Sequence, residues 1–356
     1  MVNTVSNKQV GIQDVAKAAG ISTATVSQVY NNKGEVAAAT RERVLEVGSK
    51  LGYRPNAIGQ ALRSGKSRVI GIVVSYRDSA VWEQTYMPYY RNIIAGAAIE
   101  AVEHGYSISA AASSADGRIE TYLPLDGVIV VDPVPGDPIV EQSLKNGRAV
   151  VTDGGYQAKP GAQLATVHAD MAQAIPDMLN HLARRSREAP LRPALFVGPR
   201  LDDYTVSTIE SYRHWCTTHG VASRVASLAP GQAPTDAARE LLAASTDEVN
   251  AVHCLNETYC NAITTAAAEL GLSIPGDLQV SVTGNSKAIG ADPRVAYLNI
   301  DPVETGAICA RTLIAMLEGD PAQSVAQEVT LVPAADATDP AAPAAPAAPT
   351  AAPATG

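Results

Sequence analysis

The 356-residue sequence predicts an N-terminal all-α helix-turn-helix headpiece followed by an α/β core of two doubly wound parallel-sheet lobes. Near the N-terminus, two short amphipathic segments flank a glycine, which is typical of two helices joined by a tight turn. From residue 68 onward, apolar strand-like segments alternate with helical ones, as in parallel βαβ units. Charge divides the chain at the same point, because residues 1–68 carry ten Lys/Arg against four Asp/Glu, and the remainder carries 17 against 32.

The first two predicted helices are Ile12–Ala19 and Thr23–Tyr30. Gly20 follows the first, where a helix must reverse direction, and Ser22 is a good N-cap for the second. In the second helix one face is apolar and the other is small and polar. The outward face contains Thr23, Ala24, Ser27 and Gln28, and the inward face contains Val26, Val29 and Tyr30.

A third helix is predicted over residues 39–51, with Thr40 as a cap and with Val44, Leu45 and Val47 closing a small core. An ordinary three-helix domain without a ligand is the alternative. The outward Thr/Ala/Ser/Gln face and the basic excess favour DNA, because Lys and Arg supply the attraction to phosphates.

The core is predicted from apolar runs and helical periodicity. Strands are expected at residues 69–74, 107–111, 127–131, 149–152, 194–197, 251–254 and 279–283, and helices at 89–104, 171–183, 205–218, 233–244 and 258–270. The connection from 113 to 125 is too short for a full helix. Ligands of open parallel sheets bind beyond the carboxyl ends of the strands, so a cleft there is the expected small-molecule site.

Residues 11–74 resemble the start of the lactose/galactose-repressor (LacI/GalR) family almost position by position. The matching motifs are DVAKAAG at 14–20, TVS at 25–27, TRERV at 40–44, LGYRPN at 51–56 and IGIVV at 70–74. The resemblance implies a sequence-specific transcriptional regulator, most often a repressor, that binds a palindromic operator as a homodimer. It also implies a periplasmic-binding-protein-like core that senses a small-molecule effector.

The resemblance assigns DNA contacts residue by residue. Thr23, Ala24 and Gln28 are expected to face base edges, and Ser22, Thr25, Ser27 and Asn31 to hold phosphates. Many relatives have arginine at the position of Gln28, and glutamine prefers adenine to guanine. Residues 54–67 are expected to form a hinge helix on DNA, although a plain linker is the alternative; its minor-groove residues would be Asn56, Ala57, Leu62 and Arg63.

The implied domains are the headpiece at 1–53, the hinge at 54–67, an effector-binding and dimerisation core at 68–333 and an Ala/Pro-rich tail at 334–356, predicted to be disordered. Lobe 1 is expected at about 68–166 and 300–320, and lobe 2 at about 167–298 and 321–333. A third crossing between the lobes is therefore expected near Asp320.

Expected effector contacts include an aromatic group near the cleft mouth, for which packing at an interface is an equal alternative. The full set is Tyr76, Trp82, Tyr86, Asp153, Asp170, Asn256, Glu257 and Asn285. Residues 202–208 lack an arginine that sugar-responsive relatives often carry, and 284–287 read GNSK in place of an acidic pair. A nucleoside, an aromatic metabolite or a modified sugar is therefore favoured over a simple hexose.

The sequence does not support an enzyme, a metalloprotein or a membrane protein. There is no P-loop, GxSxG, HExxH or GxGxxG motif, so no enzyme activity and no cofactor are expected. The four cysteines form no CxxC pair, and no metal site is expected. No apolar run is long enough to span a membrane and no signal peptide is visible, so the protein is expected in the cytoplasm without a membrane partner.

Overall fold

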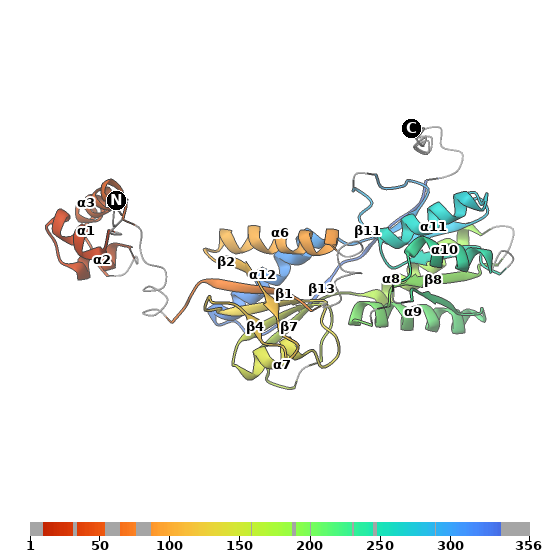
Figure 1. The fold of residues 1–356 in the computed structure, drawn as a ribbon, viewed down its shortest axis with the longest axis horizontal. Helices are drawn as coiled ribbons and strands as arrows, with labels where there is room; N and C mark the ends of the chain where they lie inside the picture. Colours follow the sequence, from red (N-terminus) through yellow and green to blue (C-terminus); the bar gives the residue numbers. More distant parts are fainter. Residues whose placement is uncertain are drawn as a thin grey trace, which may run out of the picture. The chain divides into compact units, whose positions relative to one another are not determined.

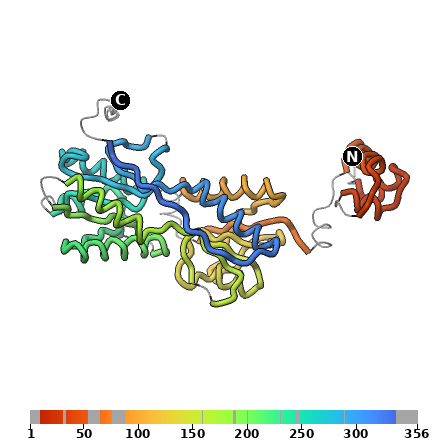
Figure 2. Tube along the Cα trace, turned by 180° about the vertical axis from the view of Figure 1, so that it is seen from behind, coloured from red at the N-terminus to blue at the C-terminus, as the bar shows by residue number. Residues whose placement is uncertain are grey.

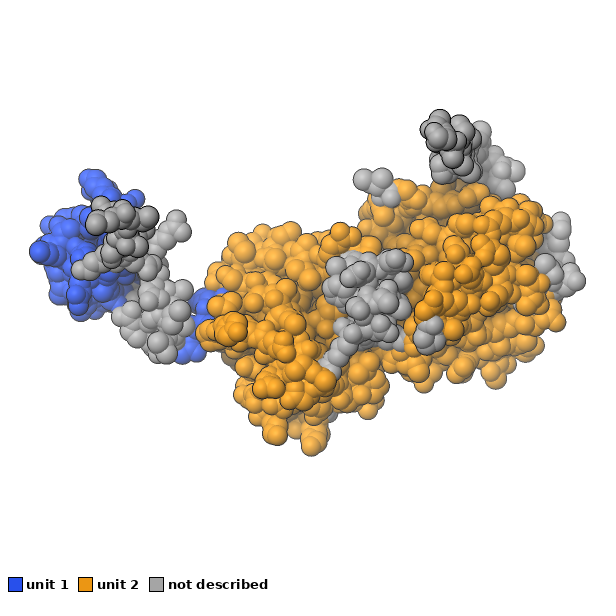
Figure 3. All heavy atoms as spheres, in the orientation of Figure 1, with its two compact units in different colours: residues 1–68 blue, residues 69–356 orange. Residues whose placement is uncertain are grey.

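The computed structural model describes residues 10–30, 34–53, 65–75, 87–157, 159–186, 190–199, 201–229, 231–244, 248–288 and 290–335. The chain divides into two compact units, residues 1–68 and residues 69–356 (Figure 3). The first is the helical headpiece and the second is the α/β core. None of the helices in these ranges is long and apolar enough to cross a membrane.

The headpiece contains α1 (Ile12–Ala19), α2 (Thr23–Tyr30) and α3 (Ala38–Leu51) (Figure 1). Gly20 ends α1 in the left-handed conformation, with a φ of 65° that suits glycine. Ser22 caps α2, because its Oγ accepts a hydrogen bond of 3.1 Å from the Thr25 N–H. The predicted bounds of the first two helices and the predicted cap are thus confirmed.

The three helices enclose a small apolar core, and two predictions about α3 are wrong. Thr40 is not its cap, because α3 begins at Ala38 and the Thr40 N–H donates to the Ala37 carbonyl inside the first turn. Leu45 is 45% exposed, because it lies on the opposite face of α3 from the core. The buried members are Val15, Ala16, Ala19, Val26, Val29 and Val44.

The first lobe of the core is built on a six-stranded parallel sheet. In the strand next to one edge of this sheet, Val69 pairs with Ser107 on one side and Ile70 pairs with Gly127 on the other. The strands, in sheet order, are β13 (Val325–Gln327), β7 (Leu164–Ala169), β6 (Ala149–Asp153), β5 (Gly127–Val131), β1 (Val69–Val74) and β2 (Ser107–Ala110). Its helices are α6 (Met87–Glu103), α7 (Pro138–Lys145) and α12 (Pro302–Glu318).

The second lobe repeats this design, with an antiparallel strand at one edge. In sheet order its strands are β14 (Thr330–Val332), β12 (Ala296–Asn299), β11 (Gln279–Gly284), β10 (Ala251–Cys254), β8 (Pro193–Val197) and β9 (Arg224–Ser227). Its helices are α8 (Met171–Arg185), α9 (Asp203–His219), α10 (Pro234–Ala243) and α11 (Glu257–Glu269). The central strands β8, β10 and β11 are buried along their whole length, as expected when helices cover both faces of a parallel sheet.

The chain passes three times between the lobes, and the last passage lies later than predicted. The prediction near Asp320 is wrong, because β13 still pairs with β7 in the first sheet and the chain joins the second sheet only at β14. Ser324 reinforces this placement, since its Oγ accepts a hydrogen bond from the Thr166 N–H. Figure 2 shows this C-terminal segment, in blue, running from one lobe to the other.

Two further boundaries bear on the predictions. Residues 111–126, all described, contain the hairpin β3 (Ala112–Ser113) and β4 (Ile119–Glu120) in place of a full helix, which agrees with the short connection.

The predicted tail begins two residues too early. Arg185 donates to the Ala334 carbonyl and the Ala335 N–H donates to the Pro293 carbonyl, so both residues belong to the second lobe. Residues 336–356 lie outside the described part of the chain.

Helix α12 brings a distant part of the chain back to the first lobe and lies along α6 (Figure 1). Two helical glycines allow the backbones to approach closely, because a Cβ on Gly306 would overlap the Ile93 carbonyl, and one on Gly96 would overlap the Val303 carbonyl. Arg311 then binds Glu100 through two hydrogen bonds of 2.9 and 2.8 Å. This ion pair lowers the pKa of Glu100 below its usual range.

Gly306→Ala should lower the free energy of unfolding of the core by about 1–3 kcal/mol, the usual cost of overpacking. The sign of this change is informative, because replacing glycine by alanine in an uncrowded helix would instead raise the free energy of unfolding by about 0.5–1 kcal/mol. Chemical denaturation measures the size and the sign of the change. Ala268→Ser, on the exposed side of α11, is the control and should change stability by less than about 0.5 kcal/mol. A stabilised Gly306→Ala protein would contradict the close packing.

Candidate nucleic-acid interface and interlobe cleft

The candidate DNA-binding surface is the outer face of α2. Val26 and Val29 are buried in the headpiece core, which turns Thr23, Ala24 and Gln28 to the exposed face. These are the three residues assigned to base edges. The side chain of Gln28 also lies close to Gly34, at the start of the connection to α3.

The residues assigned to phosphates lie beside this face. Ser22 is exposed, and Thr25 and Ser27 are partly exposed. The Ser22 and Thr25 hydroxyls share a hydrogen bond of 2.9 Å. Asn31 and the hinge residues Asn56, Ala57, Leu62 and Arg63 lie outside the described residues.

The candidate effector site is a cavity of about 420 Å³ between the lobes of the core. It lies where strands of both sheets end, as expected for open parallel sheets. The first lobe contributes Asp132, Asp153 and His168, which follow or end β5, β6 and β7. The second lobe contributes the start of α9, the β10–α11 turn and the residues after β11.

Asp153, predicted as an effector contact, ends β6 at the cavity and is only 5% exposed. The Tyr89 hydroxyl, from α6, donates a 2.9 Å hydrogen bond to its Oδ2. Burial raises the pKa of Asp153 to about 7, although the bond from Tyr89 opposes the rise and the Asp202 carboxylate adds to it. The cavity therefore contains a carboxyl group that is costly to ionise.

Asn256 and Glu257 begin α11 at the cavity. The Asn256 Oδ1 caps the helix by accepting from the Tyr259 N–H at 3.1 Å, whereas its Nδ2 is buried without a hydrogen-bond partner among the described residues. The Glu257 Oε1 accepts from the Asn285 N–H at 2.8 Å. Asn256, Glu257 and Asn285 thus line the cavity together, as predicted, whereas their role in binding stays a prediction.

Asp170 does not line the cavity, contrary to expectation. It is exposed, and its Oδ1 caps α8 by accepting from the Gln173 N–H at 3.2 Å. Its role is explained by the capping of α8. Tyr76, Trp82 and Tyr86 lie outside the described residues.

Several cavity residues were not singled out from the sequence as a site. Asp132 directly follows β5, whereas Tyr89, from the N-terminal turn of α6, belongs to the aromatic group expected near the cleft mouth. Asp202 caps α9 through a 2.7 Å bond from the Thr205 N–H. The position of a polar residue directly after an apolar strand was the signal available for Asp132.

Thr205 and Tyr204 bring buried hydroxyl groups to the second lobe's side of the cavity. Thr205 is 1% exposed, and its Oγ1 has no hydrogen-bond partner in the described part of the chain. The Tyr204 hydroxyl donates to the Leu255 carbonyl at 2.9 Å. The cavity therefore offers both satisfied and unsatisfied polar groups.

His253 lies behind this wall between two hydroxyls, with its Nδ1 2.9 Å from the Ser281 Oγ and its Nε2 3.4 Å from the Thr283 Oγ1. Burial lowers its pKa to about 4, so it is neutral near pH 7. Thr283 lines the cavity but His253 does not. The histidine is a packed structural residue in this arrangement.

One hydrogen bond joins the lobes at the edge of the cleft. The Gly155 N–H, after β6, donates at 2.9 Å to the Asp203 Oδ2, at the start of α9. A Cβ at Gly155 would collide with this carboxylate, so glycine is needed for the contact. The bond links the two lobes next to Asp153 and Asp202.

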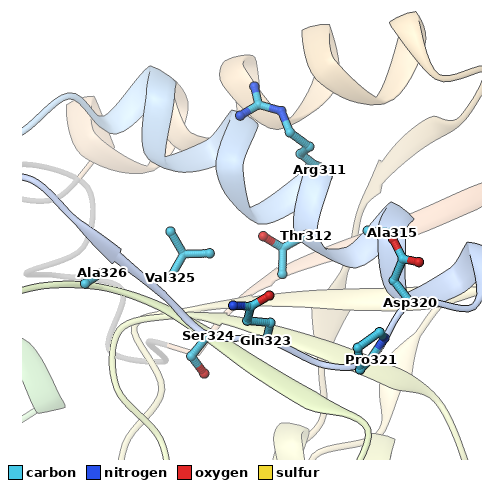
Figure 4. A pocket seen from close by; sticks show the side chains of 9 residues that line it. All are labelled: Arg311, Thr312, Ala315, Asp320, Pro321, Gln323, Ser324, Val325 and Ala326. Carbon is cyan, nitrogen blue, oxygen red and sulfur yellow. The ribbon is translucent and has the colours of Figure 1, made fainter.

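A second, more open hollow of about 600 Å³ lies beside the C-terminal half of α12. Figure 4 shows its lining side chains, which come from α12, from the segment that leads to β13 and from β13 itself. Its one basic group, Arg311, is already held by Glu100. No cluster of three metal-binding side chains occurs among the described residues, where the four cysteines are free and buried.

Models of known families match part of the headpiece and part of the core. Residues 11–56 match the family described as bacterial regulatory proteins, lacI family. Residues 169–334 match a periplasmic-binding-protein-like domain.

Similar proteins are named as regulators. The catabolite control protein A of Priestia megaterium is 25% identical over 317 residues, which cover 85% of this chain and 91% of that protein. The HTH-type transcriptional repressor CytR of Escherichia coli K12 is 25% identical over 280 residues, covering 76% and 78%.

Solved structures share the fold. A lac repressor dimer bound to operator and the anti-inducer ONPF matches with a TM-score of 0.73 and 18% identity, covering 92% of this chain and 98% of the other. A complex of the regulator CelR with cellobiose gives 0.62 and 22%, covering 91% and 98%. Residues 11–56 thus form a DNA-binding helix-turn-helix domain of the lacI family of bacterial regulatory proteins, and over most of its length the chain is similar to transcriptional regulators.

Proposed function

We propose that this regulator is a repressor that binds a near-palindromic operator as a homodimer and is controlled by a small molecule in the interlobe cleft. The observation that carries the proposal is the outer face of α2, where Thr23, Ala24 and Gln28 are exposed on a helix held by its buried valines. A recognition helix of this kind reads base edges in the major groove. A protein acting on the chromosome works in the cytoplasm.

In this proposal the phosphate contacts come from Ser22, Thr25, Ser27 and Asn31, and they set the register of α2 without reading sequence. Leu62 of the hinge wedges into the minor groove at the centre of the site, beside Arg63. Unstacking a base step costs free energy, which closer contact by two protomers must offset. The hinge and the twofold symmetry therefore depend on each other.

The outer face of α6 is the proposed dimer surface in the first lobe. Ile99 is 60% exposed and Val102 is 70% exposed, and the exposed Ala95 lies one turn before Ile99. These residues are spaced three and four apart and so form one stripe on the helix. An exposed apolar stripe is typical of a protein–protein contact.

The cleft supports effector control because both lobes contribute to it. A ligand that contacts Asp153 on one lobe and Asn256 on the other binds best at one spacing of the lobes. The relatives named above include a cellobiose complex of CelR, which is a precedent for an effector in this family. A thousandfold change in operator affinity would require about 4 kcal/mol of coupling.

Sequencing of DNA fragments retained by the purified full-length protein tests the function directly. Enrichment of a near-palindromic site, released by a small molecule that also stabilises the core, is expected. Retention of fragments without a shared sequence would refute sequence-specific binding.

Gln28→Ala should weaken binding to the selected operator by about 1–3 kcal/mol and relax base preference at one position in each half-site. The reason is loss of a bidentate contact to one base. Binding to a library of operators with single-base changes measures both effects. Ser49→Ala, on the exposed surface of α3, is the control and should change neither. An unaltered base preference in Gln28→Ala would place the reading residue elsewhere.

The double variant Ile99→Glu, Val102→Glu should shift the protein from dimer to monomer, because it places carboxylates in the proposed apolar contact. Analytical ultracentrifugation measures the mass, and operator binding should weaken in parallel. Leu270→Glu makes a matched change at an exposed leucine of the second lobe and is expected to leave the dimer intact. Deletion of residues 336–356 should also leave it intact. A variant that remains a dimer would exclude this face of α6.

A further inference from the structure

The cleft is rich in carboxylates. Asp132 and Asp153 line it from the first lobe, and Asp202, Glu257 and Asp292 line it from the second, whereas none of the described lining residues is lysine or arginine. Asp292 is paired with Arg294 at 2.7 Å. The described lining therefore carries more acidic than basic side chains, which gives the cavity a negative potential that repels anions and attracts cations.

Asp153 is the most confined of these groups. Its neighbours are the Tyr89 hydroxyl, the Asp202 carboxylate and the Cys309 thiol, with His168 on the same cavity wall, and the Asp132 carboxylate lies near the same Tyr89 hydroxyl. Among the described residues, its one direct hydrogen bond comes from the neutral Tyr89. Burial of a carboxylate without a paired cation is unfavourable, so a cation placed beside it would be strongly attracted.

Two further atoms at the cavity require a hydrogen-bond partner. The Thr205 Oγ1 and the Asn256 Nδ2 are buried and unpartnered in the described part of the chain. Both belong to residues that line the cavity. An amide N–H needs an acceptor, and a hydroxyl can donate or accept, so ligand hydroxyl groups satisfy both.

We propose that the effector is a hydroxylated primary amine of amino-sugar size, with its ammonium group at Asp153 and its hydroxyls at Thr205 and Asn256. This inference rests on the proposed role of the cleft as the effector site. A phosphorylated or carboxylated ligand is excluded by the same carboxylates. A neutral sugar leaves Asp153 without a counter-charge and binds more weakly.

Isothermal titration calorimetry of the full-length protein tests the inference with three hexosamines: glucosamine, galactosamine and mannosamine. Glucose and glucose 6-phosphate are the neutral and anionic counterparts of the first. At least one hexosamine should bind about tenfold or more tightly than its parent hexose, the size of one charge-assisted hydrogen bond. Glucose 6-phosphate should not bind.

Asp153→Asn should abolish the advantage of the amine while leaving the weak binding of the hexose unchanged. The amide is of the same size and carries no charge, so it also removes the cost of ionising a buried group. Asp170→Asn is the matched control, because Asp170 caps α8 away from the cavity and asparagine is an equally good cap. Glu257→Gln gives a second cavity variant should Asp153→Asn not fold.

The affinity for the amine should also rise with pH. Asp153, with its pKa near 7, is largely protonated at about pH 5.5 and ionised above neutrality, and the ammonium group binds the ionised form. Affinity should therefore increase up to about tenfold per pH unit below the pKa of Asp153, and it should fall again at higher pH, where the amine itself loses its proton. The Asp153→Asn protein should lack this dependence.

Equal binding of hexosamine and hexose, binding of glucose 6-phosphate, or no binding of any of the three hexosamines would overturn the inference. The function proposed above fails in a different way. If another ligand binds the cleft and releases DNA, the effector class is wrong and the regulatory role stands. If a hexosamine binds through Asp153 without changing operator affinity, the effector class stands and the coupling fails.

Discussion

The close packing of α6 on α12 is the constraint on which the rest of the core depends. The two helices are separated by about two hundred residues of chain, so their contact must hold the returning segment against the first lobe. Gly96 and Gly306 permit the backbones to approach, and the Glu100–Arg311 pair fixes their register. A bidentate pair with a partly buried carboxylate is stronger than an ordinary surface ion pair.

The same helix pair connects the cleft to the proposed dimer surface. The first turn of α6 places Tyr89 against Asp153, and Pro302 and Thr305 at the start of α12 line the same cavity. Three turns along α6, Ile99 and Val102 face outward. A packed helix pair moves as a body rather than bending, so a ligand that changes the position of Tyr89 would shift the dimer face as well.

The sequence predicted those elements that depend on local pattern. The bounds of α1, α2, β1, β5 and β10 could be read from periodicity and caps, because each has its own apolar signal. Strands β13 and β14 could not, since three-residue edge strands carry almost no periodicity and their sheets are chosen by long-range pairing. The third crossing between the lobes was misplaced for that reason.

The cleft was predictable in outline and not in its details. Strand ends indicated Asp153, Asn256 and Glu257, but a polar residue at a strand end can also cap the next helix, which is what Asp170 does. Sequence spacing does not reveal that Tyr89 reaches Asp153 across 64 residues, nor that Asp202 of the other lobe lies near enough to raise its pKa.

The charge on Asp153 links the free energy of unfolding of the core to recognition of the proposed ligand. Its pKa is raised on folding, so ionisation costs stability as pH rises from about 4 through about 7. A packed apolar side chain at this position would avoid that cost but would remove the charge that distinguishes an amine from a neutral ligand. A ligand that supplies the missing counter-charge recovers the cost only when both lobes surround it, because Asp153 and Asp202 come from different lobes. The ionisation cost at Asp153 would thereby favour the arrangement in which both lobes contact the proposed ligand.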